Sequence, residues 1–258
     1  MRIEDFLKSA ADSAGRDAAI VVAGRTHSYG QLGRAAAQVA TALVEGGVKR
    51  GDRVATVMDN SFAAVVATFA ILMAGGVVCV IGRPSDADEL AAAIVRHRAI
   101  GLVTEARFAS VVATALARSA HMRVVILSGG GCEARAGANA GCLSLEHLMT
   151  RIAPVRALLP AGAADDPAMI FDSPGAVEGV TLPFALSHAD LIDAADSAQP
   201  GEGVIVRSIF SLVGFCHLLK AMREGVTVAL QAPFEPGHRL SFSAARRPGA
   251  WLPFLEVG

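Results

Sequence analysis

Residues 168–191 contain the stretch whose residue types and spacing could do chemistry. An apolar strand runs into a glycine-containing loop and then into a helix that Ser187 opens. This order is typical of phosphate binding, because loop N–H groups and the unpaired donors of a helix N-terminus converge on one spot. The pattern predicts a cofactor-binding frame made of five residues: Ser173, Gly175, Gly179, Ser187 and His188.

The charges in this frame argue against a working phosphate site. Asp172 and Glu178 stand where a polyphosphate needs cations, and no Lys or Arg occurs between Phe171 and Leu191. The two carboxylates could hold Mg²⁺, but acids without a neighbouring phosphate-binding Lys more often mark a solvated loop. We therefore predict a vestigial phosphate loop, no metal ligands and no catalytic residue.

His188 has two interpretations. It could contact a ligand, since it follows Ser187 directly at the predicted helix start. Alternatively, Ser187 is the N-cap and Asp190 lies at N3, which accounts for both residues by helix capping and leaves His188 as an ordinary first-turn residue. We favour capping. Lys220, in the next predicted helix, is interpreted as a solvated charge.

Composition excludes several classes of partner. Of the 258 residues, 53% are hydrophobic and 18% charged, so much of the chain must be buried. The formal charge is -1 and no basic block occurs, which argues against nucleic acid. Four cysteines stand far apart without metal-ligand spacing, and we expect reduced thiols: Cys79, Cys132, Cys142 and Cys216. The N-terminus lacks the apolar run of a signal peptide, which predicts a cytoplasmic protein.

Residues 60–82 carry no charge and are long enough to suggest a membrane span. Gly75 and Gly76 divide them into a helix-like part and a β-rich part. A buried helix followed by a buried parallel strand explains the same residues, so we predict no membrane span.

The elements that must position these residues alternate regularly. Ser28 and Gln31 form a capping-box signal before an amphipathic helix, and β-rich runs alternate with helix-length segments as far as residue 130. This indicates an α/β fold of two βαβ lobes with mainly parallel sheets covered by helices. We predict four regions: a first lobe at 1–130, a loose linker at 131–166, a partial second lobe at 167–232 and an irregular tail at 233–258.

Three blocks carry a resemblance to a known family: HSYGQL, LVEGGVKRGDRVATVMDNS and ATFAILMAGGVVCVI. In order and spacing they resemble the N-terminal part of the adenylate-forming ligases, which comprise acyl- and aryl-CoA synthetases, nonribosomal-peptide adenylation domains and luciferases. The likeness continues through LSHADL and SIFSLVGFCHLLKAMREGVTVAL to about Leu230. It implies a substrate pocket that includes Phe210, Ser211, Gly214 and His217.

The resemblance also exposes departures. The family loop reads roughly S-G-T-T-G-x-P-K-G-V, and its Lys, its hydroxyls and most of its glycines are missing here. Ser211 replaces the His of the family's "F-H-x-x-G" block. The family's "Y-G-x-T-E" segment, its ribose-binding acid and its mobile C-terminal domain have no match, so we expect a truncated, degenerate member.

These departures predict a protein that does not adenylate alone and acts as a binding or partner protein. The alternative is a component of an ATP-dependent, acyl-adenylate-forming ligase that another chain completes. We expect self-association or a protein that supplies the missing half, and an acyl or aryl carboxylate as ligand. No cofactor is predicted for this chain; if the family activity survives, the resemblance implies ATP and Mg²⁺.

Overall fold

Two compact units make up the chain in a computed structural model, and each is described by itself. The model describes residues 1–130, 141–152, 162–174, 181–198, 204–231, 240–247 and 250–257. The first unit comprises residues 1–2, 34–58 and 66–189, and the second comprises residues 3–33, 59–65 and 190–258.

The first unit is built on a seven-stranded sheet in the order β7-β6-β5-β3-β4-β8-β9. Neighbouring strands are parallel except for the β8–β9 pair. The four residues of β4 are all buried, as expected for a central parallel strand covered on both faces. The strands are β3 (Arg53–Val57), β4 (Val77–Val80), β5 (Gly101–Glu105), β6 (Val124–Ser128), β7 (Gly141–Ser144), β8 (Pro167–Pro174) and β9 (Thr181–Ser187).

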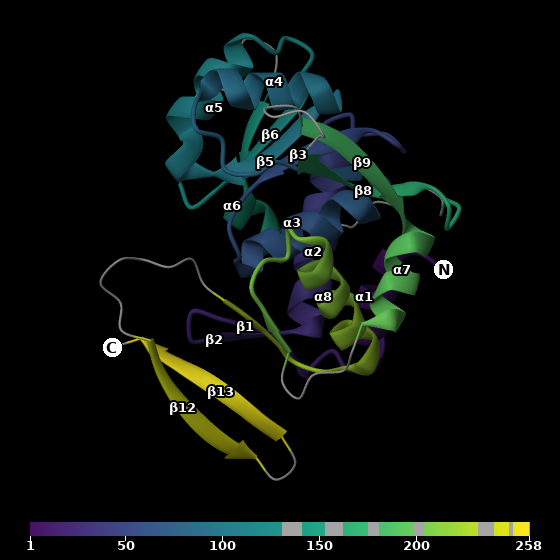
Figure 1. Ribbon diagram of the computed structural model, residues 1–258, viewed down its shortest axis with the longest axis vertical. Helices are drawn as coiled ribbons and strands as arrows, with labels where there is room; N and C mark the ends of the chain where they lie inside the picture. Colours follow the sequence, from purple (N-terminus) through teal and green to yellow (C-terminus); the bar gives the residue numbers. More distant parts are fainter. Residues whose placement is uncertain are drawn as a thin grey trace. The chain divides into compact units, whose positions relative to one another are not determined.

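Helices α4 (Ala87–His97) and α5 (Ala109–Ala117) lie side by side against β5 and β6 (Figure 1). Leu90, Leu102 and Leu116 belong to the core that these elements share. A short 3₁₀ turn, Ala106–Phe108, precedes α5, and α6 spans Leu145–Thr150.

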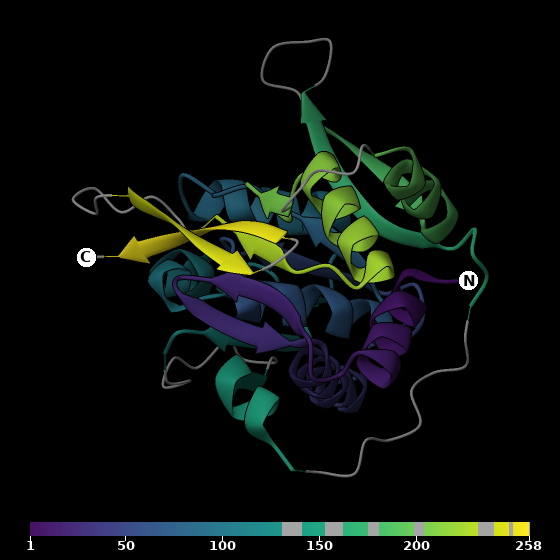
Figure 2. The ribbon, with the colours of Figure 1, turned by 90° about the horizontal axis from the view of Figure 1, so that it is seen from below.

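The second unit contains a four-stranded sheet in the order β10-β11-β1-β2. Strands β10, β11 and β1 are parallel, and β1 and β2 form an antiparallel hairpin (Figure 2). Helix α1 packs against α8, and β12 and β13 form a separate antiparallel pair. The elements are α1 (Ile3–Ser13), β1 (Ala18–Val22), β2 (Arg25–Ser28), β10 (Val204–Val206), α8 (Leu212–Glu224), β11 (Val228–Leu230), β12 (Leu240–Arg247) and β13 (Ala250–Val257).

Three helices carry residues of both units. They are α2 (Tyr29–Glu45), α3 (Phe62–Met73) and α7 (His188–Ser197). The predicted capping box opens α2: Ser28 Oγ accepts from the Gln31 N–H at 3.3 Å, and Gln31 Oε1 accepts from the Ser28 N–H at 2.9 Å.

The α/β class with mainly parallel sheets is confirmed.

The uncharged segment at residues 60–82 is divided as predicted. Helix α3 ends at Met73, Gly75 adopts a left-handed φ of 74°, and β4 begins at Val77. Gly75 relieves the strain that a side chain would meet at this φ. None of the helices in the described ranges combines the length and the apolar character that crossing a membrane requires.

Several expected boundaries differ from the structure. The units interleave along the sequence, because β8, expected in a second lobe at 167–232, pairs with β4 in the sheet of the first unit. Strand β7 falls within the expected linker at 131–166 and pairs with β6. Strands β12 and β13 occupy the tail at 233–258 that was expected to be irregular, where LSFS alternates apolar and polar residues with the period of a strand.

Candidate functional site

The predicted phosphate frame lies on the β8–β9 hairpin of the first unit. Ser173 pairs with Leu182 near the loop end, whereas Ser187 pairs with Pro167 at the other end of the hairpin. Leu182 and Ser187 are five positions apart along β9, a distance of about 17 Å. The start of α7 and the loop end of β8 therefore do not meet, because an unpredicted strand lies between them. Gly175, Gly179 and Glu178 lie outside the described residues.

The backbone donors at the start of α7 are already occupied. The His188 N–H donates to the carbonyl of Asp166 at 3.2 Å, and the Ala189 N–H donates to the carbonyl of Ala164 at 2.9 Å. Asp166 is held in turn by the guanidinium of buried Arg2, whose Nη1 lies 3.2 Å from Asp166 Oδ2. These two N–H groups are therefore already hydrogen-bonded within the chain. The His188 side chain is fully buried.

Asp172 forms a charged cluster with the end of α4. Its Oδ2 accepts from Arg96 Nη2 at 2.7 Å, and its Oδ1 lies 3.0 Å from Nε2 of His97. The His97 side chain is fully buried, and that of Asp172 is 19% exposed. Asp172 is therefore not the solvated-loop acid that the sequence suggested. No local pattern indicates this cluster, because Arg96 and Asp172 are 76 positions apart.

Burial dominates the electrostatics of this cluster. It lowers the pKa of His97, although the neighbouring Asp172 carboxylate acts in the opposite direction. Arg53, which donates from Nη1 to the His97 carbonyl at 3.0 Å, also lowers that pKa. Nearby Cys79 is buried, and burial raises its pKa to about 12, so its thiol is not a nucleophile at neutral pH.

The described residues at the hairpin do not fit the phosphates of ATP. The first α7 donors are used internally, and the guanidinium of Arg96 is paired with Asp172. Phosphate binding at this place would also oppose the Asp172 carboxylate. Within the described ranges, no group of three or more His, Cys, Asp or Glu side chains could hold a metal ion.

The predicted substrate residues lie in the second unit, at the turn that leads into α8. Ser211 is the N-cap of α8: its Oγ accepts from the Gly214 N–H at 3.1 Å and donates to the Ser208 carbonyl at 2.9 Å. Gly214 is required there, because a Cβ would lie 1.9 Å from the Ser208 carbonyl oxygen. Phe210 and His217 are each half-buried. The turn and the first part of α8 thus bring these residues together locally.

Asn60 is the residue of this turn that sequence reasoning missed. It precedes α3 and is 7% exposed. Its amide donates to carbonyls at the ends of β10 and β11, and its Oδ1 accepts from the Ile209 N–H at 3.0 Å. The available signal was the Asn that follows the GDRVATVMD block.

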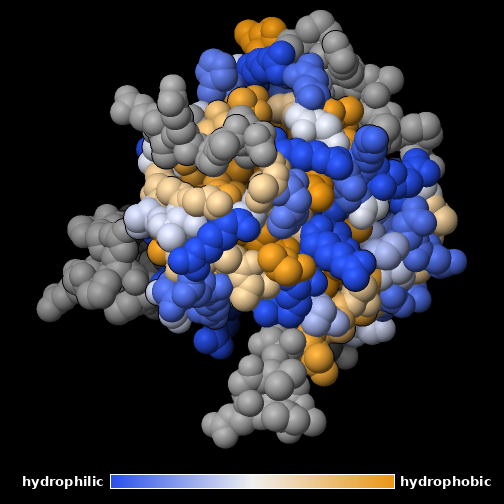
Figure 3. Space-filling model, turned by 90° about the horizontal axis from the view of Figure 1, so that it is seen from above, coloured by the Kyte–Doolittle hydropathy of each residue, from blue (hydrophilic) through white to orange (hydrophobic). Residues whose placement is uncertain are grey.

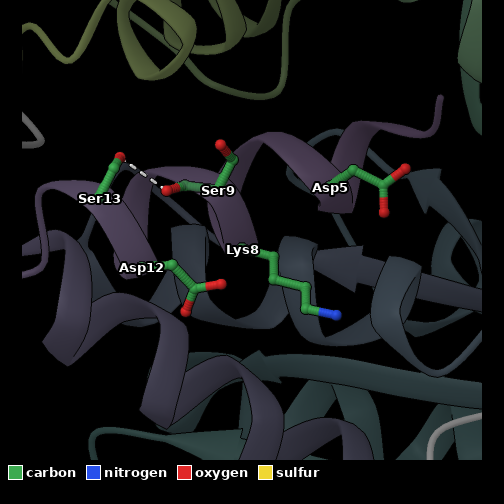
Figure 4. Close-up of a pocket in the computed structure, with 5 residues that line it drawn as sticks. All are labelled: Asp5, Lys8, Ser9, Asp12 and Ser13. Carbon is green, nitrogen blue, oxygen red and sulfur yellow. Dashed lines mark hydrogen bonds between the residues drawn. The ribbon is translucent and has the colours of Figure 1, made fainter.

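A shallow depression lies along α1 and contains none of the predicted site residues. Its lining comes from one helix face and comprises Asp5, Lys8, Ser9, Asp12 and Ser13 (Figure 4). The one hydrogen bond drawn there runs from Ser13 Oγ to the Ser9 carbonyl, at 2.8 Å. Mixed charges on an open helix face indicate a solvated surface.

Two further predictions need correction. Lys220 is not a free solvated charge, since its amine donates to the carbonyl of Ala198 just after α7. Cys79 and Cys216 are free and buried as expected, whereas Cys142 is disulfide-bonded.

The fold and the hairpin define the class of protein. The α/β fold with its mainly parallel sheets is like that of the N-terminal domain of adenylate-forming ligases. The chain belongs to the AMP-binding enzyme family, whose model matches residues 6–173, more than half of the chain.

Individual relatives cover this chain unequally. The anthranilate CoA ligase AuaEII, in complex with anthranoyl-AMP, has a TM-score of 0.79 and 19% identity over 90% of this chain and 45% of its own. The luciferase-like enzyme of Zophobas morio has a TM-score of 0.78 and 14% identity over 91% of this chain and 55% of its own. Chalcone synthase cfoA of Aspergillus candidus is 32% identical over 126 residues, which are 49% of this chain and 4% of that protein. This chain therefore spans about half the length of the two solved structures.

Proposed function

We propose that this acyl-CoA synthetase-like chain binds an acyl or aryl carboxylate and does not form an acyl adenylate by itself. The observation that carries the proposal is the cluster at Asp172. An acid stands at the loop end of β8, and the adjacent guanidinium of Arg96 is paired with it. Acyl-adenylate formation depends on neutralising phosphate charge, and the guanidinium at this place is already neutralised by Asp172.

The acid-binding half of the proposal rests on the turn before α8. Ser211 and Gly214 fix that turn by hydrogen bonding and close approach, although the family's His is absent. The substitution at Ser211 therefore changes the side-chain chemistry but keeps the backbone frame. A cytoplasmic location is part of the same proposal.

Pyrophosphate exchange tests this function. Purified protein is incubated with Mg·ATP, labelled pyrophosphate and a panel of aryl and straight-chain acids, beside an active family enzyme as positive control. We expect no acid-dependent exchange above the protein-free blank. Exchange that scales with protein concentration, and that disappears when the acid is omitted, contradicts the proposal.

A second candidate is a ligase component that another chain completes. It is favoured by β9, an edge strand whose Leu182 and Phe184 are 57% and 39% exposed. Figure 3 shows hydrophobic side chains in small groups among hydrophilic ones on the face that it displays. Exposed apolar side chains on a sheet edge favour pairing with a further strand, from a second copy or from another protein.

Association measurements separate the two candidates. Light scattering of the pure protein reports self-association, and the exchange assay is repeated with a separately expressed C-terminal half of a family ligase. Acid-dependent exchange only in the mixture favours the completed-ligase candidate. No association and no exchange in the mixture leave the binding protein as the function.

A further inference from the structure

Asn60 connects three backbone segments of the second unit. Its Nδ2 donates to the carbonyls of Val206 at 3.2 Å, Arg207 at 2.8 Å and Gln231 at 3.0 Å. Its Oδ1 accepts from the Ile209 N–H at 3.0 Å. One buried side-chain amide thus fixes the backbone at the ends of β10 and β11 and at the start of the following turn.

The turn stands at the carboxyl edge of two parallel strands. Val206 ends β10, and Gln231 follows β11 and donates its N–H to the Val206 carbonyl at 3.0 Å. The two strands are parallel, so Asn60 lies at their shared carboxyl edge. Ligands of open α/β sheets bind outside this edge.

The backbone of residues 207–211 is fixed from both sides. Asn60 holds its beginning, while Ser211 Oγ bonds the Ser208 carbonyl and the first turn of α8 holds its end. Side chains that leave this turn therefore start from fixed positions. Preorganisation of this kind lowers the ordering cost of binding.

Arg207 is the cation of this turn. Arg207 is exposed, and its side chain forms no ion pair with any other residue that the structure describes. Half-buried Phe210 and 66%-exposed Val213 supply apolar surface on the same turn and the start of α8. A guanidinium on the same turn as apolar side chains suits an organic carboxylate, whose two oxygens match the guanidinium fork.

We infer that Arg207 binds the carboxylate group of the acyl or aryl acid, and that Asn60 is the positioning residue that fixes the backbone from which Arg207 extends. The inference rests on the proposed function, because it names a residue that contacts the acid ligand. It adds a charge contact at a position that the family resemblance does not assign.

The test compares acids with their neutral amides. Isothermal titration uses aryl acids, straight-chain acids from butyrate to dodecanoate, and the corresponding amides as probes of the full chain. We expect the chain to prefer acids, and R207Q to lower acid affinity about fivefold while leaving amide affinity unchanged. R25Q is the matched control, since Arg25 is an exposed arginine on β2, at the opposite edge of the same sheet.

The role of Asn60 is tested by a double-mutant cycle. N60S retains a hydroxyl donor and is expected to lose part of the preference for acids over amides. Combining N60S with R207Q should weaken acid binding no further than R207Q alone, because both changes act through one contact. Additive losses contradict the positioning role. If N60S does not fold, hydrogen exchange on the wild-type chain replaces it, and acid binding must increase protection of the Ile209 amide.

The outcomes separate the inference from the proposed function. If no acid binds the wild-type chain, the proposed function and the inference both fail. If acids bind and R207Q keeps the full preference over amides, the inference fails and the proposed function stands. If R207Q loses the preference for acids over amides and R25Q keeps it, the result supports both the inference and the proposed function.

Discussion

The loop end of β8 and the turn before α8 differ in how their charged groups are paired. At β8, Arg96 pairs with Asp172, and Nε2 of buried His97 lies 3.0 Å from the same carboxylate. At the turn, Asn60 and Ser211 satisfy the backbone and leave the guanidinium of Arg207 without an ion-pair partner among the described residues. The charges of the first region balance one another. The second region has a fixed backbone, and its cation, Arg207, has no ion-pair partner among the described residues.

Under the proposed function, the fold keeps its backbone frame at a place where the side-chain chemistry is lost. Strand pairing and helix capping depend on backbone groups, which most substitutions preserve. Phosphate binding depends on particular side-chain charges, and the charge of Arg96 is here paired with Asp172.

Substitution of Gly214 by alanine should have the largest effect on stability. The added Cβ would lie 1.9 Å from the Ser208 carbonyl oxygen, so the turn must move. We expect G214A to lower the unfolding free energy by more than about 3 kcal/mol in urea titrations. G82A is the control, because a Cβ at exposed Gly82 meets nothing within 4 Å. Equal stability of the two variants would show that the turn is not fixed.

Removal of Arg96 should have the next largest effect, in the first unit. R96Q leaves a mostly buried Asp172 without its 2.7 Å partner, and should lower the unfolding free energy by about 1 to 2 kcal/mol. R118Q is the control, since the pair of Arg118 with Asp88 is largely exposed and should contribute little. If both changes are equally mild, Asp172 is better solvated than the cluster indicates.

A smaller loss is expected from Tyr29, whose ring is fully buried in the second unit. Its hydroxyl donates to the Val226 carbonyl at 2.8 Å, and burial raises its pKa to about 12. Y29F should lower the unfolding free energy by about 1 kcal/mol. Because the residue lies away from the turn, acid affinity should not change, and a change would connect α2 to ligand binding.

The smallest effect is a dependence on pH that comes from His97. Its pKa in the folded chain lies below the 6.5 of the unfolded chain, so the unfolded state takes up the proton first as pH falls. His97 therefore lowers stability as pH falls below about 6.5. The unfolding free energy should fall less between pH 7.5 and 5.5 in H97Q than in the wild type. His27, whose pKa burial also lowers, is tested by H27Q to separate the two contributions.

Much of the fold follows from local patterns in the sequence. The capping box at Ser28 and Gln31, the break at Gly75 and the βαβ alternation each depend on neighbours in sequence. The site depends on contacts between distant residues, such as Arg96 with Asp172 and Asn60 with Arg207, 147 positions apart. No periodicity reports such contacts, and strand β9 was missed because its neighbours suggested a loop that led directly to a helix.

Thermal unfolding with two kinds of ligand tests the central claim most directly. The chain is heated alone, with Mg·ATP, with AMP as control, and with an acid from the titration panel. A ligand at about a hundred times its dissociation constant stabilises a fold by about 2.7 kcal/mol, which is about 5 to 10 °C in midpoint for a chain of this size. We expect such a shift with the acid and none with millimolar Mg·ATP. A shift with Mg·ATP and none with any acid would contradict both the proposed loss of phosphate binding and the proposed acid binding.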